Sequence, residues 1–139
     1  MWNLEPGTWN SVAYDEPCHL LHAQKVSAAP KAVLAAIPGL KNVPLADAET
    51  CCGSAGIYSV LQPALSEAVL AKKIDAIRTC GAGTVATGNP GCLMQIERGC
   101  REAGLGVRVV HPVVLLAEAY DRELSANSSQ PSTNKNQDR

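Results

Sequence analysis

The sequence predicts an α/β fold in which about four strands form a mostly parallel sheet with helices on both faces. Short apolar stretches alternate with longer segments of helical character along the chain. The short stretches do not alternate polar with apolar residues, which is typical of parallel strands buried on both faces. With 139 residues, the chain is long enough for one domain with a substantial core.

Turn residues and apolar runs place the individual elements. We expect strands at residues 11–14, 42–46, 83–87 and 107–110. We expect helices at residues 18–25, 30–37, 54–61, 63–79, 90–103 and 112–124. Proline is favoured at the first position of a helix, where its missing N–H has no partner to lose, and Gly81 is suited to end the longest helix.

The longest predicted helix has one apolar side. Leu65, Val69, Ile74 and Ile77 recur at roughly helical spacing, and we expect them to face the sheet. The charged residues of this segment fall mostly outside that stripe, so they are predicted to be exposed: Glu67, Lys72, Lys73 and Arg78.

The two ends of the chain differ from its middle. Residues 1–10 carry both tryptophans and are expected to form an N-terminal arm, and residues 11–124 form the folded domain. Residues 125–139 consist of serine, asparagine, glutamine, threonine, proline and charged residues, with a single alanine. Such a composition has too little apolar surface to fold, so a disordered tail is predicted.

Composition excludes several function classes. The net charge of −1 argues against a nucleic-acid partner, because phosphate binding needs clustered lysine and arginine. The sequence shows neither a signal peptide nor a membrane span, so the cytoplasm is the expected compartment. Thiols stay reduced in the cytoplasm, and six cysteines therefore favour metal, cluster or redox chemistry over disulfides.

Cysteines follow three of the four predicted strands. Cys18 comes after the first strand, Cys51 and Cys52 after the second, and Cys92 after the third. The carboxyl ends of parallel strands meet at one edge of the sheet, where sites form in open α/β folds. The four thiols are therefore expected to share a site, and four thiolates are what a [4Fe-4S] cluster requires. A zinc ion is the alternative occupant.

The remaining cysteines and polar residues are assigned weaker roles. Cys100 lies about 12 Å beyond Cys92 along one helix, and Cys80 precedes a strand, so both are expected to be structural. His19, Gly53, Asn89 and His111 are candidates for supporting the site around its ligands. The more ordinary interpretations are an exposed His22, loop charges at Asp15 and Glu16, and a turn at Asn89.

At these residues the sequence resembles the cysteine-rich CCG domain family over about residues 11–120. The similar segments are Tyr14-Asp15-Glu16-Pro17-Cys18-His19-Leu20, Cys51-Cys52-Gly53-Ser54-Ala55-Gly56, Thr87-Gly88-Asn89-Pro90-Gly91-Cys92 and His111-Pro112-Val113. The domain occurs in heterodisulfide reductase and in lactate-utilisation proteins. The sequence is most similar to the last domain of the glycolate oxidase iron–sulfur subunit.

This resemblance implies a role in electron transfer. It implies that Cys18, Cys51, Cys52 and Cys92 are the cluster-site cysteines. A flavin-containing subunit would oxidise glycolate to glyoxylate, and the iron–sulfur subunit would pass the electrons towards a quinone. The chain would then be a non-catalytic part of an oxidoreductase. Its partners would be that flavin subunit and the rest of the iron–sulfur subunit, with peripheral membrane association only through the complex.

Two departures from the family pattern affect these expectations. Several relatives have Cys-x-x-Cys as the third element, and here Asn89 occupies its first position. This removes a possible fifth ligand and argues against the non-cubane clusters of heterodisulfide reductase, while a conventional four-iron cluster or a zinc ion would still fit four thiolates. The chain also lacks the ferredoxin-like part and the earlier copy of the domain, so a stand-alone version, a split gene product or a fragment is expected.

Two other function classes compete with electron transfer. One is a zinc-bound or metal-free interaction domain whose cysteines serve only the fold and the contacts with partner subunits. The other is a thiol-redox enzyme, but Cys51 and Cys52 lack the two-residue spacer of the usual dithiol motif. Metal content separates the first alternative from a cluster protein, and thiol–disulfide exchange activity tests the second.

Overall fold

The computed structural model describes residues 10–128, apart from the side chain of residue 127. The predicted N-terminal arm, residues 1–10, therefore lies outside the described residues except for Asn10, and so do residues 129–139 of the predicted tail. No helix in the described part of the chain is long and apolar enough to cross a membrane.

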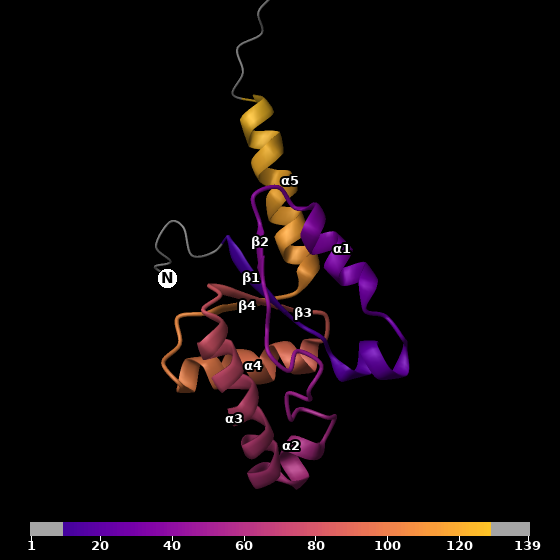
Figure 1. Cartoon of the computed structure of the whole chain (residues 1–139), viewed down its shortest axis with the longest axis vertical. Coiled ribbons are helices and arrows are strands. Elements are labelled where there is room, and N and C mark those ends of the chain that lie inside the picture. The colour runs from indigo at the N-terminus through magenta and orange to yellow at the C-terminus, as the bar shows by residue number, and fades with distance from the viewer. Residues whose placement is uncertain (1–9, 129–139) are drawn as a thin grey trace, which may run out of the picture.

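A four-stranded parallel sheet forms the centre of the molecule (Figure 1). Its strands are β1 (Ser11–Asp15), β2 (Lys41–Val43), β3 (Thr84–Thr87) and β4 (Arg108–Val110). Their order is β2-β1-β3-β4, and every pair of neighbours is parallel. The predicted α/β class, the number of strands and their parallel direction are all confirmed.

Helices cover both faces of this sheet (Figure 1). One face carries α3 (Pro63–Cys80) and α4 (Pro90–Glu102), with the short α2 (Tyr58–Leu61) beside α3. The opposite face carries α1 (Ala28–Ala36) and α5 (Pro112–Ser128), which contact each other. A single π-helical turn, η1 (His19–Ala23), follows β1.

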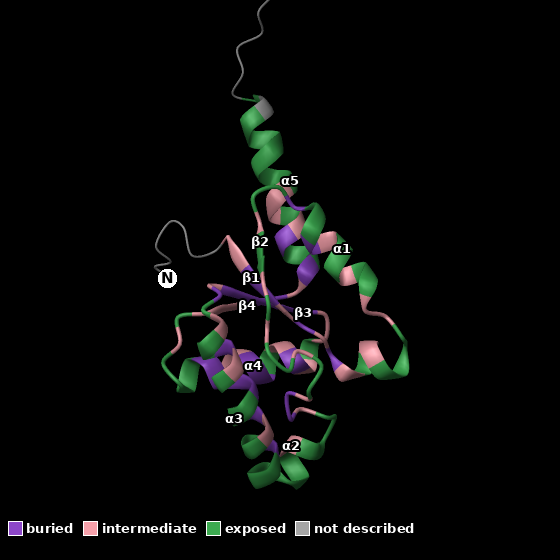
Figure 2. Cartoon of the chain, viewed as in Figure 1, coloured by how far each residue is buried: buried purple, intermediate pink, exposed green. Residues whose placement is uncertain are grey.

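Each face of the sheet has its own apolar core, and Figure 2 shows the buried residues gathered at the sheet. Ala13 and Val85 pack with Leu70, Ile74 and Ile96 of α3 and α4. Their strand neighbours Val12 and Ala86 pack on the opposite side with Leu34 and Leu115. Successive strand residues face opposite sides, and both sides are covered, which explains why the strand sequences are apolar without alternation.

Several element boundaries differ from the prediction, and helix α1, for example, begins at Ala28 rather than at Pro30. Strand β2 ends at Val43 because Pro44, which has no N–H, follows it. Helix α2 begins only at Tyr58, since Gly56 just before it has a left-handed φ of 59°. The segment after Cys18 is one π-helical turn rather than a longer helix. Finally, α5 continues to Ser128, four residues into the predicted tail.

The buried side of α3 also differs from the predicted stripe. Leu65 is 55% exposed, whereas the residues that face the core are Ser66, Leu70, Lys73, Ile74 and Ile77. The prediction that Lys73 is exposed was wrong, since this lysine is only 1% exposed. Its burial is explained by polar partners at the carboxyl edge of the sheet, described below.

Candidate functional site

Four cysteines from three distant stretches of the chain line one pocket at the carboxyl edge of the sheet. Cys18 immediately precedes η1, Cys51 and Cys52 lie in the loop between β2 and α2, and Cys92 lies in the first turn of α4. The pocket has a volume of about 680 Å³. The structure thus brings together all four thiols that the sequence placed at this edge.

The walls of this pocket come from the same three stretches. The other lining residues are His19, His22, Ala23, Ser54, Ala55, Gly56, Asn89 and Gly91. Cys52 and Cys92 are buried, while Cys18 and Cys51 are partly exposed. All six cysteines of the chain are free thiols.

The sulfur atoms influence each other directly. The Sγ atoms of Cys52 and Cys92 lie 3.1 Å apart in hydrogen-bond contact. This hydrogen bond lowers the pKa of Cys52 to about 7 and raises the pKa of Cys92, which burial raises further. Burial, together with the neighbouring Cys51 sulfur, raises the pKa of Cys18. One thiol of the group is therefore readily ionised near neutral pH.

Backbone N–H groups donate to three of the four sulfurs. The N–H of Gly53 donates to Cys51 Sγ over 3.3 Å. Backbone hydrogen bonds from His19 and Ser54 favour the ionised forms of Cys18 and Cys52, respectively. Hydrogen bonds of this kind stabilise thiolates and tune the potentials of clusters that thiolates hold.

Gly53 fixes the turn that follows the paired cysteines. Its φ of 87° lies in the left-handed region, and an added Cβ would stand 2.5 Å from the carbonyl oxygen of Ser66. The Ser66 hydroxyl donates to Gly53 O over 2.8 Å and accepts from Gln95 Nε2 over 3.1 Å. Only glycine fits this close approach, so the Cys-Cys-Gly turn is held tightly against α3.

Asn89 is the N-cap of α4. Its side-chain oxygen accepts from the N–H of Gly91 over 2.9 Å and from that of Cys92 over 3.2 Å. The turn predicted at this position is thus present, and it fixes the backbone of the residue that carries the fourth sulfur. Asn89 also lines the pocket, as expected of a residue that supports the site.

The histidines are divided between two places. His19 and His22 both line the pocket, and His19 Nε2 lies 3.2 Å from Gln24 Nε2. His111, which the sequence placed at the same edge, is not part of the pocket lining. Its Nδ1 accepts from the N–H of Val113, so it caps α5 instead. The reason is the strand order, in which β4 is separated from β1 by β3.

Sequence reasoning missed a buried ion pair beneath the site. Asp15, interpreted as a loop charge, ends β1 and is 1% exposed. It pairs with Lys73, whose Nζ lies 2.9 Å from Asp15 Oδ1. Spacing indicates only that Lys73 shares one side of its helix with Leu70 and Ile77, and it does not indicate the partner. Glu16 is partly buried and pairs with Lys31 at 2.9 Å.

Cys80 and Cys100 lie away from the pocket. Cys80 ends α3 before β3 begins, which places it at the opposite edge of the sheet, and its Sγ donates to Ile77 O over 3.1 Å. Cys100 is buried in the apolar core, and burial raises its pKa to about 11. Both residues occupy the structural surroundings that the sequence predicted for them.

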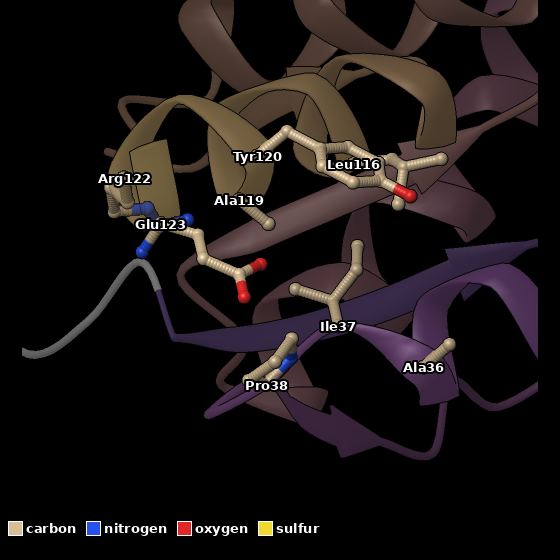
Figure 3. A pocket seen from close by; sticks show the side chains of 8 residues that line it. All are labelled: Ala36, Ile37, Pro38, Leu116, Ala119, Tyr120, Arg122 and Glu123. Carbon is tan, nitrogen blue, oxygen red and sulfur yellow. The ribbon is translucent and has the colours of Figure 1, made fainter. Parts of the chain in front are cut away.

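A second pocket, of about 590 Å³, lies between α1 and α5 (Figure 3). Its described lining is mainly apolar, with Arg122 and Glu123 at one end, and holds no cysteine or histidine. This second pocket therefore offers no thiol or imidazole ligand, unlike the first.

The donor set of the first pocket suits an iron–sulfur cluster. Four cysteine sulfurs line one hollow, and backbone N–H groups donate to three of them. Within residues 10–128, no three histidine, cysteine or acidic side chains are arranged to hold a single metal ion.

Comparison with known proteins identifies the same region. A family profile described as a cysteine-rich domain, CCG, matches residues 12–97. The chain is 37% identical over 116 residues to a Bacillus subtilis protein named "Probable glycolate oxidase iron-sulfur subunit", covering 82% of this chain and 26% of that protein. It is 37% identical over 110 residues to a subunit of the fumarate reductase (CoM/CoB) of Methanothermobacter marburgensis, covering 78% and 22%.

A third relative is lactate utilization protein A of Shouchella clausii, which is 35% identical over 98 residues. The match covers 70% of this chain and 41% of that protein. The chain thus spans less than half the length of each of these three relatives.

Proposed function

We propose, since the chain belongs to the CCG cysteine-rich domain family, that it holds an iron–sulfur cluster and carries electrons within an oxidoreductase. The ligands in this proposal are Cys18, Cys51, Cys52 and Cys92. The observation that supports it most strongly is that sulfurs from three separate stretches of chain line one pocket. Thiols kept only for folding would have no reason to gather where three strands end.

The four cysteines fit a cubane [4Fe-4S] cluster in number and chemistry. Such a cluster supplies one-electron transfer when bound. The residues of the chain would contribute thiolate ligands, and the lowered pKa of Cys52 makes one of them available near neutral pH. Asn89, at the position where some relatives have a further cysteine, caps a helix and would not be a ligand.

The wider role follows from the relatives. By similarity to the glycolate oxidase iron–sulfur subunit, the chain would receive electrons from a flavin subunit that oxidises glycolate or a similar 2-hydroxy acid. It would pass them towards a quinone-type acceptor in the cytoplasm or at the membrane surface. The chain would not be catalytic alone, and it would work together with the rest of an iron–sulfur subunit.

Metal and sulfide analysis of anaerobically purified protein tests this proposal. We expect a brown protein with about four irons and four acid-labile sulfides per chain. Its broad visible absorbance should fade on reduction with dithionite and return on reoxidation. A colourless protein that contains zinc or no metal would contradict the proposal and favour the interaction domain.

A further inference from the structure

Lys73 makes an unusual set of contacts for a lysine inside a domain. Its side chain has 0% exposure. Three oxygens surround its Nζ: Asp47 O at 2.9 Å, Ala48 O at 3.0 Å and Asp15 Oδ1 at 2.9 Å. An ammonium group has three N–H donors and no acceptor. The two carbonyl oxygens accept hydrogen bonds from Nζ, and Asp15 Oδ1 is its ion-pair partner.

The carboxylate partner extends this network to a third strand end. Asp15 Oδ2 accepts from Thr87 Oγ1 over 2.9 Å. Thr87 is the last residue of β3, and its side chain is buried. Asp15 is the last residue of β1, so the carboxylate bridges two neighbouring strands at their carboxyl ends.

Each partner of Lys73 lies a few residues before a cysteine of the pocket. Asp15 precedes Cys18 by three residues, and Ala48 precedes Cys51 by three. Thr87, reached through Asp15, precedes Cys92 by five residues. A single buried network therefore joins the three stretches of chain that carry the four sulfurs.

Helix α3 holds the paired-cysteine loop on both sides. Lys73 binds the carbonyls of Asp47 and Ala48 before the two cysteines, and Ser66 binds the carbonyl of Gly53 after them. Ser66 and Lys73 are seven residues apart, which is about two helical turns, and both face the core. Helix α3 itself carries no cysteine of the pocket.

We propose that Lys73 and Asp15 are positioning residues, which set the spacing of the cysteine-bearing segments so that the four sulfurs can bind one cluster. The inference deepens the proposed function and rests on it. A purely structural role explains the pair poorly, because a buried ion pair seldom stabilises a fold more than apolar residues of similar volume. By contrast, the pair contacts the segments that carry the four cysteines, as residues that orient metal ligands do.

The test uses the double variant Asp15→Asn/Lys73→Met, which removes both charges together and leaves no unpaired ion. The matched control is Lys72→Met, at the exposed neighbouring lysine of the same helix. Far-ultraviolet circular dichroism and thermal unfolding report the fold. Iron content after anaerobic reconstitution reports the site.

A metal-free measurement reports sulfur geometry without the cluster. Diamide takes two electrons and two protons from two neighbouring thiols, which leaves a disulfide. Cys52 Sγ and Cys92 Sγ are 3.1 Å apart, so we expect this bond to form rapidly in the unmodified protein, as mapped by mass spectrometry. Samples quenched at a series of times give the rate of disulfide formation in each variant.

We expect the double variant to keep its circular dichroism and its cooperative unfolding while the site loses order. Cys52–Cys92 disulfide formation should slow about tenfold, and the affinity for iron should fall about 10–100-fold, as for other residues that orient ligands. The Lys72→Met control should behave as the unmodified chain does. A folded double variant with unchanged disulfide rate and iron affinity would overturn the proposal.

If the double variant does not fold, Lys73→Arg decides the question. Arginine keeps the positive charge but presents a planar fork in place of a tetrahedral ammonium, so it cannot face the same three oxygens. We expect a folded protein with a slower disulfide rate, and an unchanged rate would contradict the inference. A slower rate in a chain that never binds iron would leave the positioning role intact and defeat only the proposed function.

Discussion

At the scale of single residues, Cys52 has the most distinctive chemistry. An ordinary cysteine thiol has a pKa near 8.5, whereas the hydrogen bond with Cys92 lowers the pKa of Cys52 to about 7. The thiolate form should therefore increase as the pH rises through about 7, well below the range in which an isolated thiol ionises.

Titration of metal-free protein tests this shift. We expect the difference in ultraviolet thiolate absorbance between the unmodified chain and Cys52→Ala to have its midpoint near pH 7. Replacing the partner by Cys92→Ala removes the hydrogen bond, so the midpoint should move up towards the ordinary value. A midpoint near 8.5 in the unmodified chain would show that the two sulfurs do not interact in this way.

Gly53 should be the least replaceable glycine near the site. Gly53→Ala combines a left-handed φ of 87° with a Cβ that would meet Ser66 O at 2.5 Å. We expect the free energy of unfolding to fall by about 2–5 kcal/mol, as measured by urea denaturation. Gly56→Ala is the control: its φ of 59° is also left-handed, but nothing lies within 4 Å of the added Cβ. Its cost should be only about 1–2 kcal/mol, and equal costs would refute the close-approach argument.

Residue chemistry alone could predict the cysteines but not the ion pair beneath them. Spacing and the positions of the strand ends were enough to predict that Cys18, Cys51, Cys52 and Cys92 lie together, and all four line one pocket. Lys73 was expected to be exposed, because a lysine is rarely buried without a partner, and its partners are backbone carbonyls that no sequence pattern reveals. His111 follows the carboxyl end of β4, at the predicted edge, but it does not line the pocket, because β4 is separated from β1 by β3 and the sequence does not give the order of strands.

At the scale of elements, helices α3 and α4 position the site from one face of the sheet. Helix α3 supplies Ser66 and Lys73, and α4 supplies Cys92 from its first turn. The start of α4 depends on its cap, since Asn89 satisfies two N–H groups that otherwise lack partners.

Asn89→Ala tests the role of this cap. We expect the free energy of unfolding to decrease by about 1 kcal/mol, measured by denaturant titration. Because one of the lost hydrogen bonds holds the backbone of Cys92, reconstituted iron content should also decrease. Asn42→Ala, at an exposed position of β2, serves as the control and should change neither quantity. An Asn89→Ala variant as stable as the control would contradict the capping role.

The elements themselves were largely predictable, and the errors have physical causes. Prolines and glycines marked the helix ends well, as at Pro63, Pro90 and Gly81. The short α2 and the π-helical η1 depend on left-handed residues, Gly56 and Lys25, whose conformation is not encoded by hydrophobic spacing. The extension of α5 to Ser128 runs through polar residues that a composition argument assigns to a tail.

At the scale of the whole molecule, the parallel sheet brings cysteines that are distant in the sequence close together in space. All four strands point the same way, so the segments that leave β1, β2 and β3 emerge at one edge. The cysteines after those strands therefore meet, while Cys80, which precedes a strand, is at the other edge. The order β2-β1-β3 places these three strands side by side, so the cysteine-bearing segments that follow them are neighbours in space.

The most direct measurement of the proposed site is the iron and acid-labile sulfide content of six single Cys→Ala variants, each reconstituted anaerobically beside the unmodified chain. We expect replacement of Cys18, Cys51, Cys52 or Cys92 to remove most of the cluster, because each supplies one of about four required thiolates. Cys80→Ala and Cys100→Ala should keep the iron content of the unmodified chain, since neither residue lines the pocket. Full iron and sulfide in any of the first four variants, or loss of the cluster from a folded Cys80→Ala or Cys100→Ala protein, would contradict this assignment.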